Sequence, residues 1–125
     1  MLLDHSGSLE VQVTVEPQPT SSAQTPPPLL VLDSEPTADT HSVFVQCKTT
    51  HRQIYERAQS RIPKSLPSGT QVLLFNHDGL VTEGNIANVA VSVPVGGKLQ
   101  LVTPKLDAGL LAGTVRSQLI ETGKI

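Results

Sequence analysis

Residues that alternate between apolar and polar, together with short apolar runs, divide most of the chain into predicted strands separated by turn residues. Strands of this kind place every second side chain on the same face of a sheet. The predicted strands are residues 9–15, 29–32, 43–47, 71–76, 80–82, 88–93 and 98–102. The last two flank Gly96-Gly97, a pair that tolerates the positive backbone angles of a hairpin turn. The pattern therefore predicts a sheet-rich domain with a hairpin in its second half.

Two segments instead carry the spacing of helices. Residues 51–61 place apolar side chains four positions apart, with Thr50 as the predicted N-cap and Pro63 as the residue that ends the helix. Residues 114–122 form the second predicted helix, and Gly123 is its predicted C-terminal cap.

These elements predict a division of the chain into three parts. Residues 1–15 are expected to be a remnant strand of a preceding domain, because the chain starts as though in the middle of a hairpin. Residues 16–28 are rich in proline and polar residues, which is typical of a linker or exposed loop. Residues 29–125 are expected to form an α/β (α+β) domain with a mixed, mostly antiparallel sheet and two helices.

Composition narrows the classes of function. The formal net charge of −2 and the pI near 6.0 argue against nucleic acid or an anionic membrane as the main partner. No apolar run approaches the roughly 20 residues of a membrane span, and the first residues lack a secretory signal pattern. The single cysteine fits a reducing, cytoplasmic setting, and the four histidines lack metal-ligand spacing, so no metal site is expected.

Three features are candidates for binding a charged cofactor. Glu83 stands at a strand end beside Gly84, where a ligand can approach the backbone closely. The helix opened by Gly113 and Thr114 offers free backbone N–H groups, which suit a phosphate. Lys48 lies between a strand and a helix, where partial desolvation favours the neutral amine of a Schiff-base lysine. The alternatives are a solvated acid, a plain turn and a surface lysine, all of which are common.

Several motifs occur together in the order and approximate spacing of one family. They are Lys48-Thr49-Thr50-His51-Arg52, Tyr55, residues 71–76, Asp78-Gly79, residues 82–88, Thr103-Pro104 and residues 111–116. In this, residues 30–125 resemble the class IV aminotransferases, which are fold-type IV enzymes dependent on pyridoxal 5'-phosphate. The Lys-Thr-Thr-x-Arg form is most similar to the aminodeoxychorismate lyase branch.

The resemblance implies roles for seven residues. Lys48 would form the internal aldimine with the cofactor and move the substrate's α-proton, and Glu83 would pair with the pyridinium nitrogen. The remaining residues would bind or support the cofactor: Arg52, with a structural or electrostatic role; Asn88, in support of Glu83; and Gly113, Thr114 and Val115, at the phosphate.

The resemblance also implies a reaction. The intact enzyme would convert 4-amino-4-deoxychorismate, an amino-acid-like small molecule, to 4-aminobenzoate and pyruvate for folate synthesis. The alternatives are a branched-chain or D-amino-acid aminotransferase, and an inactive fragment or association module without catalysis. The chain resembles the large carboxy-terminal domain of family members, truncated at both ends, and a homodimer is implied by the resemblance only.

Overall fold

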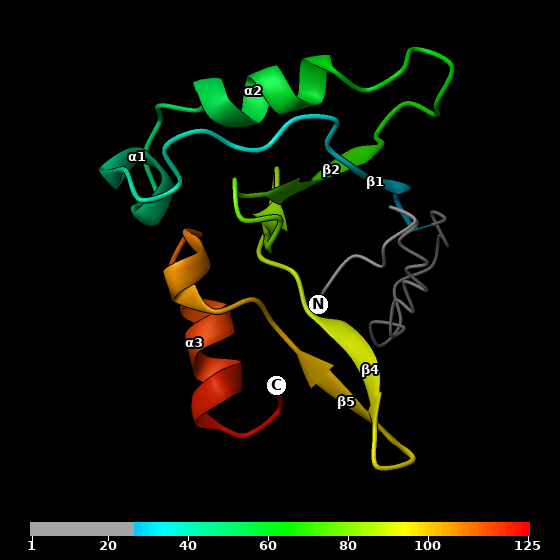
Figure 1. The fold of residues 1–125 in the computed structure, drawn as a ribbon, viewed down its shortest axis with the longest axis vertical. Helices are drawn as coiled ribbons and strands as arrows, with labels where there is room; N and C mark the ends of the chain where they lie inside the picture. Colours follow the sequence, from blue (N-terminus) through cyan, green and yellow to red (C-terminus); the bar gives the residue numbers. More distant parts are fainter. Residues whose placement is uncertain (1–26) are drawn as a thin grey trace, which may run out of the picture.

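The computed structural model describes residues 27–125 and contains two small sheets and three α-helices among them (Figure 1). The elements are β1 (Leu30–Leu32), α1 (Val43–Gln46), α2 (Gln53–Ser60), β2 (Gln71–Phe75), β3 (Val81–Gly84), β4 (Val91–Val95), β5 (Lys98–Val102), a 3-10 turn (Leu106–Ala108) and α3 (Thr114–Glu121). The predicted remnant strand and all but the last two residues of the predicted linker lie outside the described residues.

The first sheet has the order β1-β2-β3, with β2 in its centre. β1 runs parallel to β2, and β3 runs antiparallel to β2 with a register shift between the Leu73 and Phe75 pairings. Just beyond the Leu73–Gly84 pair, Asn85 holds Val72 in both directions: its Oδ1 accepts a hydrogen bond from the Val72 amide at 2.9 Å, and its own amide donates to the Val72 carbonyl at 2.9 Å. The residues that immediately follow Glu83 therefore stay bound to β2.

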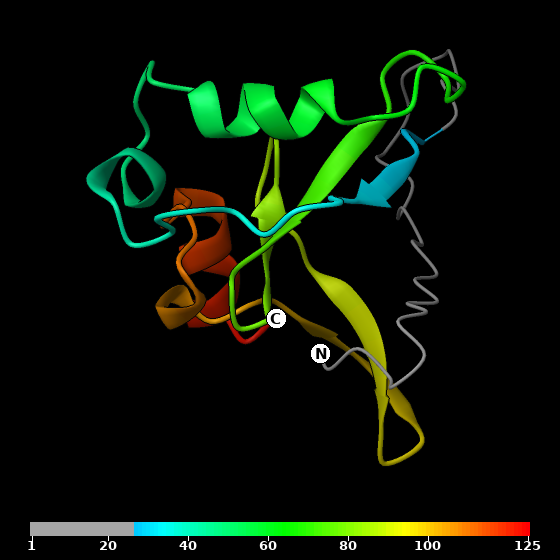
Figure 2. The ribbon, with the colours of Figure 1, turned by 45° about the horizontal axis from the view of Figure 1, so that its top comes forward.

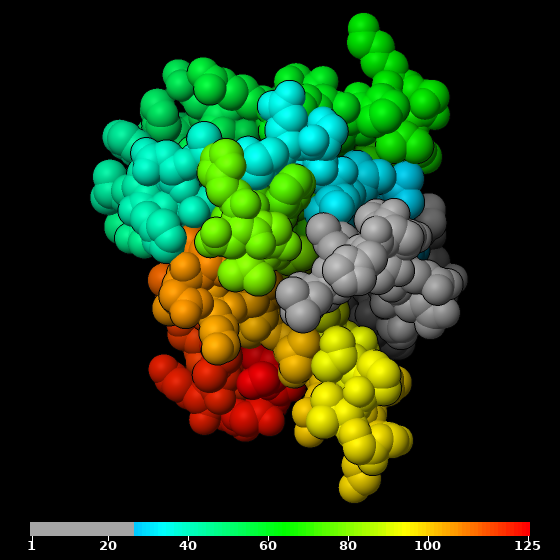
Figure 3. All heavy atoms as spheres, viewed as in Figure 1, coloured from blue at the N-terminus to red at the C-terminus, as the bar shows by residue number. Residues whose placement is uncertain are grey.

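The second sheet is the β4–β5 hairpin, which projects from the rest of the molecule at the end opposite α2 (Figures 1 and 3). Gly96 and Gly97 form its turn with φ of 58° and 81°, the positive values that the sequence predicts for this pair. With one parallel and two antiparallel strand pairs, the predicted mixed, mostly antiparallel α/β architecture is confirmed.

Helix α2 covers one face of the first sheet (Figure 2). Ala58 of α2 packs against Val72 and Leu74 of β2, and all three residues are 1% exposed. Tyr55 and Ile62 pack at the edge of this cluster. The apolar spacing in residues 51–62 therefore correctly predicted both the helix and the face that it buries.

Two predictions of local structure before α2 are wrong. The predicted strand at residues 43–47 is instead the single helical turn α1, in which the amides of Gln46 and Cys47 donate to the Ser42 and Val43 carbonyls and only Val45 is buried. Helix α2 begins at Gln53, with Arg52 rather than Thr50 at the N-cap position and no side-chain cap. Lys48 consequently lies five residues before α2 and is exposed, so the predicted partial desolvation of its side chain is also wrong.

An ion pair fixes the end of α2 to the end of β1. Arg61 donates from Nε to Asp33 Oδ1 at 2.7 Å and from Nη2 to Oδ2 of the same carboxylate. The Asp33 side chain is fully buried, whereas that of Arg61 is 25% exposed. Burial opposes ionisation of Asp33, but the hydrogen bonds and charge of Arg61 outweigh it and lower the pKa of the carboxyl.

Candidate functional site

Glu83 is a buried carboxylate on β3, 3% exposed, that accepts hydrogen bonds from three separate segments. The Tyr55 hydroxyl donates to Oε1 at 2.8 Å. Oε2 accepts from Asn88 Nδ2 at 3.1 Å and from the Leu111 amide at 3.2 Å. Glu83 therefore connects α2, the loop after β3 and the segment that leads into α3.

Burial determines the electrostatic state of this site. Desolvation raises the pKa of the Glu83 carboxyl, although the Tyr55 and Leu111 hydrogen bonds and the Arg52 charge partly oppose it. Burial, and then the hydrogen bond and charge of Glu83, raise the pKa of the Tyr55 hydroxyl. Tyr55 therefore stays protonated at neutral pH and donates to the Glu83 carboxylate.

Lys48 and Glu83 line the same cavity, although they are 35 positions apart in the sequence. This cavity has a volume of about 190 Å³, and Arg52 and Tyr55 also contribute to its wall. The Arg52 guanidinium lies 4.8 Å from the centre of the Tyr55 ring and donates to the Asn85 carbonyl at 2.7 Å. One cavity thus presents an amine, a guanidinium and a buried carboxylate.

A larger hollow of about 740 Å³ adjoins the first, and Lys48 also lines it. The two share Cys47, Lys48, Ile86, Ala87 and Leu111. The wall of the larger hollow includes Asn88 and the start of α3, at Gly113, Thr114 and Val115. All seven predicted site residues therefore line one or the other of two adjoining hollows, and Lys48 lines both.

The amino terminus of α3 approaches Asn88 closely. Asn88 Nδ2 donates to the Leu111 carbonyl at 2.9 Å as well as to Glu83. Gly113 is the N-cap residue of α3 and makes no side-chain cap, and a Cβ at this position would overlap Asn88 Oδ1. The absence of a side chain at Gly113 thus keeps Asn88 in place and the first turn of α3 open to the larger hollow.

We expect Gly113→Ala to lower the free energy of unfolding by about 1–3 kcal/mol, as overpacking of a tight contact does. The added methyl group would displace Asn88 and break its hydrogen bond to Glu83. Urea denaturation measures the loss. Gly123→Ala is the comparison: Gly123 has open space around it, so any loss there comes from the strain of its φ of +66° and not from a steric clash. An unchanged stability for Gly113→Ala would show that Asn88 is free to move aside.

The sequence model of the family described as "Amino-transferase class IV" matches residues 3–124, almost the whole chain. The chain belongs to this family. The match also extends the similarity to the residues before position 30, where the sequence motifs alone did not reach.

Two fungal relatives of this class IV chain carry related names. A Schizosaccharomyces pombe protein named "Putative aminodeoxychorismate lyase" is 38% identical over 113 residues, which cover 90% of this chain and 47% of that protein. The Saccharomyces cerevisiae "Aminodeoxychorismate lyase" is 39% identical over 109 residues, covering 77% of this chain and 28% of that protein. The chain thus spans half or less of the length of these curated relatives.

One solved structure is similar to this chain in both fold and sequence. The crystal structure of a "Putative amino-acid aminotransferase" from Mesorhizobium loti superposes with a TM-score of 0.63 at 33% identity. The alignment covers 77% of this chain and 44% of that one. The described residues therefore correspond to part of a longer class IV aminotransferase fold.

Three residues of this class IV site received no role from the sequence. Tyr55 lies one turn after Arg52 on α2, and that spacing alone places the two side chains on one helix face. The Leu111 contact comes from its backbone amide, which no side-chain pattern reveals. Arg116 is 8% exposed and donates to Thr103 Oγ1 at 3.2 Å and to the Pro104 carbonyl at 2.6 Å, so it ties α3 to the end of β5.

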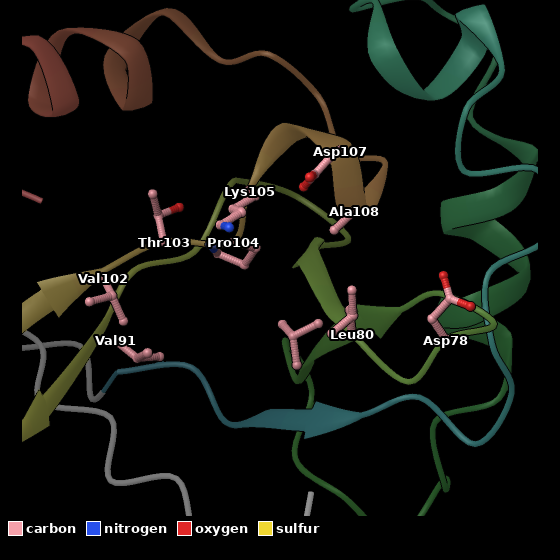
Figure 4. Close-up of a pocket in the computed structure, with 10 residues that line it drawn as sticks. Asp78, Leu80, Val91, Val102, Thr103, Pro104, Lys105, Asp107 and Ala108 are labelled. Carbon is pink, nitrogen blue, oxygen red and sulfur yellow. The ribbon is translucent and has the colours of Figure 1, made fainter. Parts of the chain in front are cut away.

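A third hollow, of about 600 Å³, lies between β3 and the hairpin and contains none of the predicted site residues (Figure 4). Its wall combines the apolar residues Leu80, Val91 and Val102 with charged residues near the rim. Within residues 27–125 no three histidine, cysteine or acidic side chains group as metal ligands. No helix in the same range is long and apolar enough to cross a membrane.

Proposed function

We propose that the adjoining hollows around Lys48 bind pyridoxal 5'-phosphate. Enzymes of the class IV family depend on this cofactor in general. The donor set here fits its three polar features: an amine for the aldehyde, a carboxylate for the ring nitrogen and a glycine-opened helix terminus for the phosphate. The observation that carries the proposal is that Lys48 and Glu83 line one cavity.

Lys48 is the residue that would attach the cofactor and then hold the proton taken from the substrate's α-carbon on its Nζ. Because Lys48 is exposed and lines both hollows, its side chain could reach a ligand held in either of them. When bound, the cofactor supplies a conjugated ring that accepts the electron pair left at the α-carbon.

Glu83 would hold the protonated ring nitrogen. A cation placed against this buried carboxylate lowers its pKa, since an opposite charge favours the ionised form. Asn88 would support Glu83 through the hydrogen bond between them. Arg52, held by the Asn85 carbonyl, would add positive charge to the same wall.

The phosphate would lie at the first turn of α3, against the backbone amides of Thr114 and Val115. The first N–H groups of a helix have no partner within the helix, and the positive end of its dipole favours an anion there. The N-cap residue Gly113 leaves these amides uncovered by any side chain of its own.

The reaction that we propose for the intact protein is elimination of pyruvate from 4-amino-4-deoxychorismate, which leaves 4-aminobenzoate. The names of the two fungal relatives, at 38% and 39% identity, support this choice of reaction. The substrate's atoms are divided between the two products without an oxidant or water. A base at the α-carbon is the main protein group required, and Lys48 would supply it.

Peptide mapping after borohydride reduction tests the proposal. The protein is mixed with pyridoxal phosphate and reduced, and the mass of the bound cofactor is located among its five lysines. We expect the modification on Lys48, while Lys64, Lys98, Lys105 and Lys124 serve as exposed internal controls. Equal labelling of all five lysines, or none on Lys48, would contradict a cofactor site here and favour an association module without catalysis.

Transamination of a branched-chain or D-amino acid is the second candidate. The Mesorhizobium loti relative, named for amino-acid transamination, supports it. Both reactions begin with loss of the α-proton to the same lysine, so the cofactor residues do not separate them. Assays of the intact protein do: pyruvate and 4-aminobenzoate released in equal amounts indicate the lyase, whereas keto-acid formation that needs a second amino-group acceptor indicates the transaminase.

A further inference from the structure

Within residues 27–125, Tyr55 is the one side chain that joins the core of the domain directly to the Glu83 carboxylate. Its ring packs against the buried cluster of Ala58, Val72 and Leu74, while its hydroxyl donates to Glu83 Oε1 at 2.8 Å. Tyr55 also lines the cavity that Lys48 and Glu83 share. The core therefore fixes the hydroxyl, and the hydroxyl in turn fixes one oxygen of the acid.

The hydrogen bonds from the described part of the chain occupy all but one acceptor position of Glu83. A carboxylate offers about four lone-pair positions, two on each oxygen. The Asn88 amide and the Leu111 amide occupy both positions on Oε2, while Tyr55 occupies one on Oε1. The remaining position belongs to the same oxygen that Tyr55 holds.

We propose that Tyr55 is a positioning residue of the cofactor site: its hydroxyl orients Glu83 Oε1 toward an incoming N–H donor and favours the charged form of the carboxylate. This inference rests on the proposed cofactor site. With this role, α2 helps to position the Glu83 carboxylate, together with the loop after β3 and the segment before α3.

Other charges near Glu83 do not replace this contact. The Arg52 guanidinium and the Lys48 amine line the same cavity, and the Cys47 thiol lies next to Lys48 on its wall. The described residues include no salt bridge between Glu83 and a cation, so its direct donors are neutral groups. Deleting the Tyr55 hydroxyl removes one of three such donors and keeps the ring that packs against the core.

The first test uses the protein without cofactor. The pKa of Glu83 is read by NMR of glutamate labelled with ¹³C at the side-chain carboxyl, and the Glu83 signal is assigned with Glu83→Gln. We expect Tyr55→Phe to raise this pKa by about one pH unit, as loss of a hydrogen bond to a charged group does. Ser60→Ala is the matched control, because it removes a hydroxyl from α2 that donates only to the Arg57 carbonyl.

A second change at Tyr55 keeps the proposal testable if Tyr55→Phe does not fold. The chain has one tyrosine, so 3,5-difluorotyrosine supplied during expression alters Tyr55 alone. The fluorinated hydroxyl is more acidic and a stronger donor, and we expect it to lower the pKa of Glu83. Shifts in opposite directions for the two changes support the proposal; an unchanged pKa in both would overturn it.

The loaded protein separates failure of this inference from failure of the proposed function. We expect Tyr55→Phe to weaken pyridoxal phosphate binding about 10-fold, by the loss of one charge-assisted hydrogen bond. If the wild type binds and Tyr55→Phe binds equally well, Tyr55 has no positioning role. If the wild type fails to bind while the Glu83 pKa still responds to Tyr55, the cofactor proposal fails and the positioning of the acid stands.

Discussion

Replacing Lys48 by arginine is expected to remove all cofactor that borohydride can fix at that position. Arginine keeps a positive charge that attracts the phosphate, but its guanidinium stays protonated and is not the amine nucleophile that the aldehyde requires. Fixed cofactor per chain should fall to the background level of the exposed lysines. Any activity of the protein should fall by at least about 100-fold, since a proton-transfer group of this kind contributes that much or more.

Lys105→Arg is the matched control for this change. Lys105 is also exposed and also lines a hollow, the one between β3 and the hairpin, which contains none of the predicted site residues. Mass spectrometry of the reduced proteins should find the wild-type amount of cofactor on Lys105→Arg. An equal loss in the two variants would mean that the cofactor reacts with surface amines, and the role of Lys48 would be withdrawn.

Local signals in the sequence predicted the parts of the fold that depend on local chemistry. The Gly96-Gly97 pair determined the hairpin turn, and the four-residue spacing of apolar side chains determined α2 and its buried face. Residues 43–47 were predicted wrongly because a short apolar run is also compatible with one helical turn that buries only Val45. A run this short has no periodicity that separates a strand from a helical turn, so its packing against the rest of the fold decides.

In the candidate site, too, the sequence predicted some features and tertiary packing decided the others. Family motifs named seven residues, and all of them line the adjoining hollows. The donors that hold Glu83 were harder to foresee, because Tyr55 and Leu111 each lie 28 positions away from it. Contacts of this range come from the way α2 and the segment before α3 pack onto β3, and spacing along the chain carries no information about them.

Replacing Arg61 by methionine is expected to lower the free energy of unfolding strongly, because it breaks the ion pair that joins α2 to β1. The change leaves the fully buried Asp33 carboxylate without its cation, and loss of one partner of a buried pair costs about 3–5 kcal/mol. Because Arg61 is 25% exposed, we expect the lower end of this range. That is still a large part of the 5–15 kcal/mol that is typical of a small domain.

The dependence of this loss on pH identifies its cause. Arg61 lowers the pKa of Asp33, so the stability from the pair is fully present above the ordinary aspartate pKa, about 4, and is lost as the pH falls through the lower value in the folded protein. Urea denaturation should therefore find a large difference between wild type and Arg61→Met at pH 7 and a smaller one below about pH 4. Arg57→Met, an exposed change on the same helix, is the control. If it costs as much as Arg61→Met, or if the difference is independent of pH, the ion pair does not hold α2 to β1.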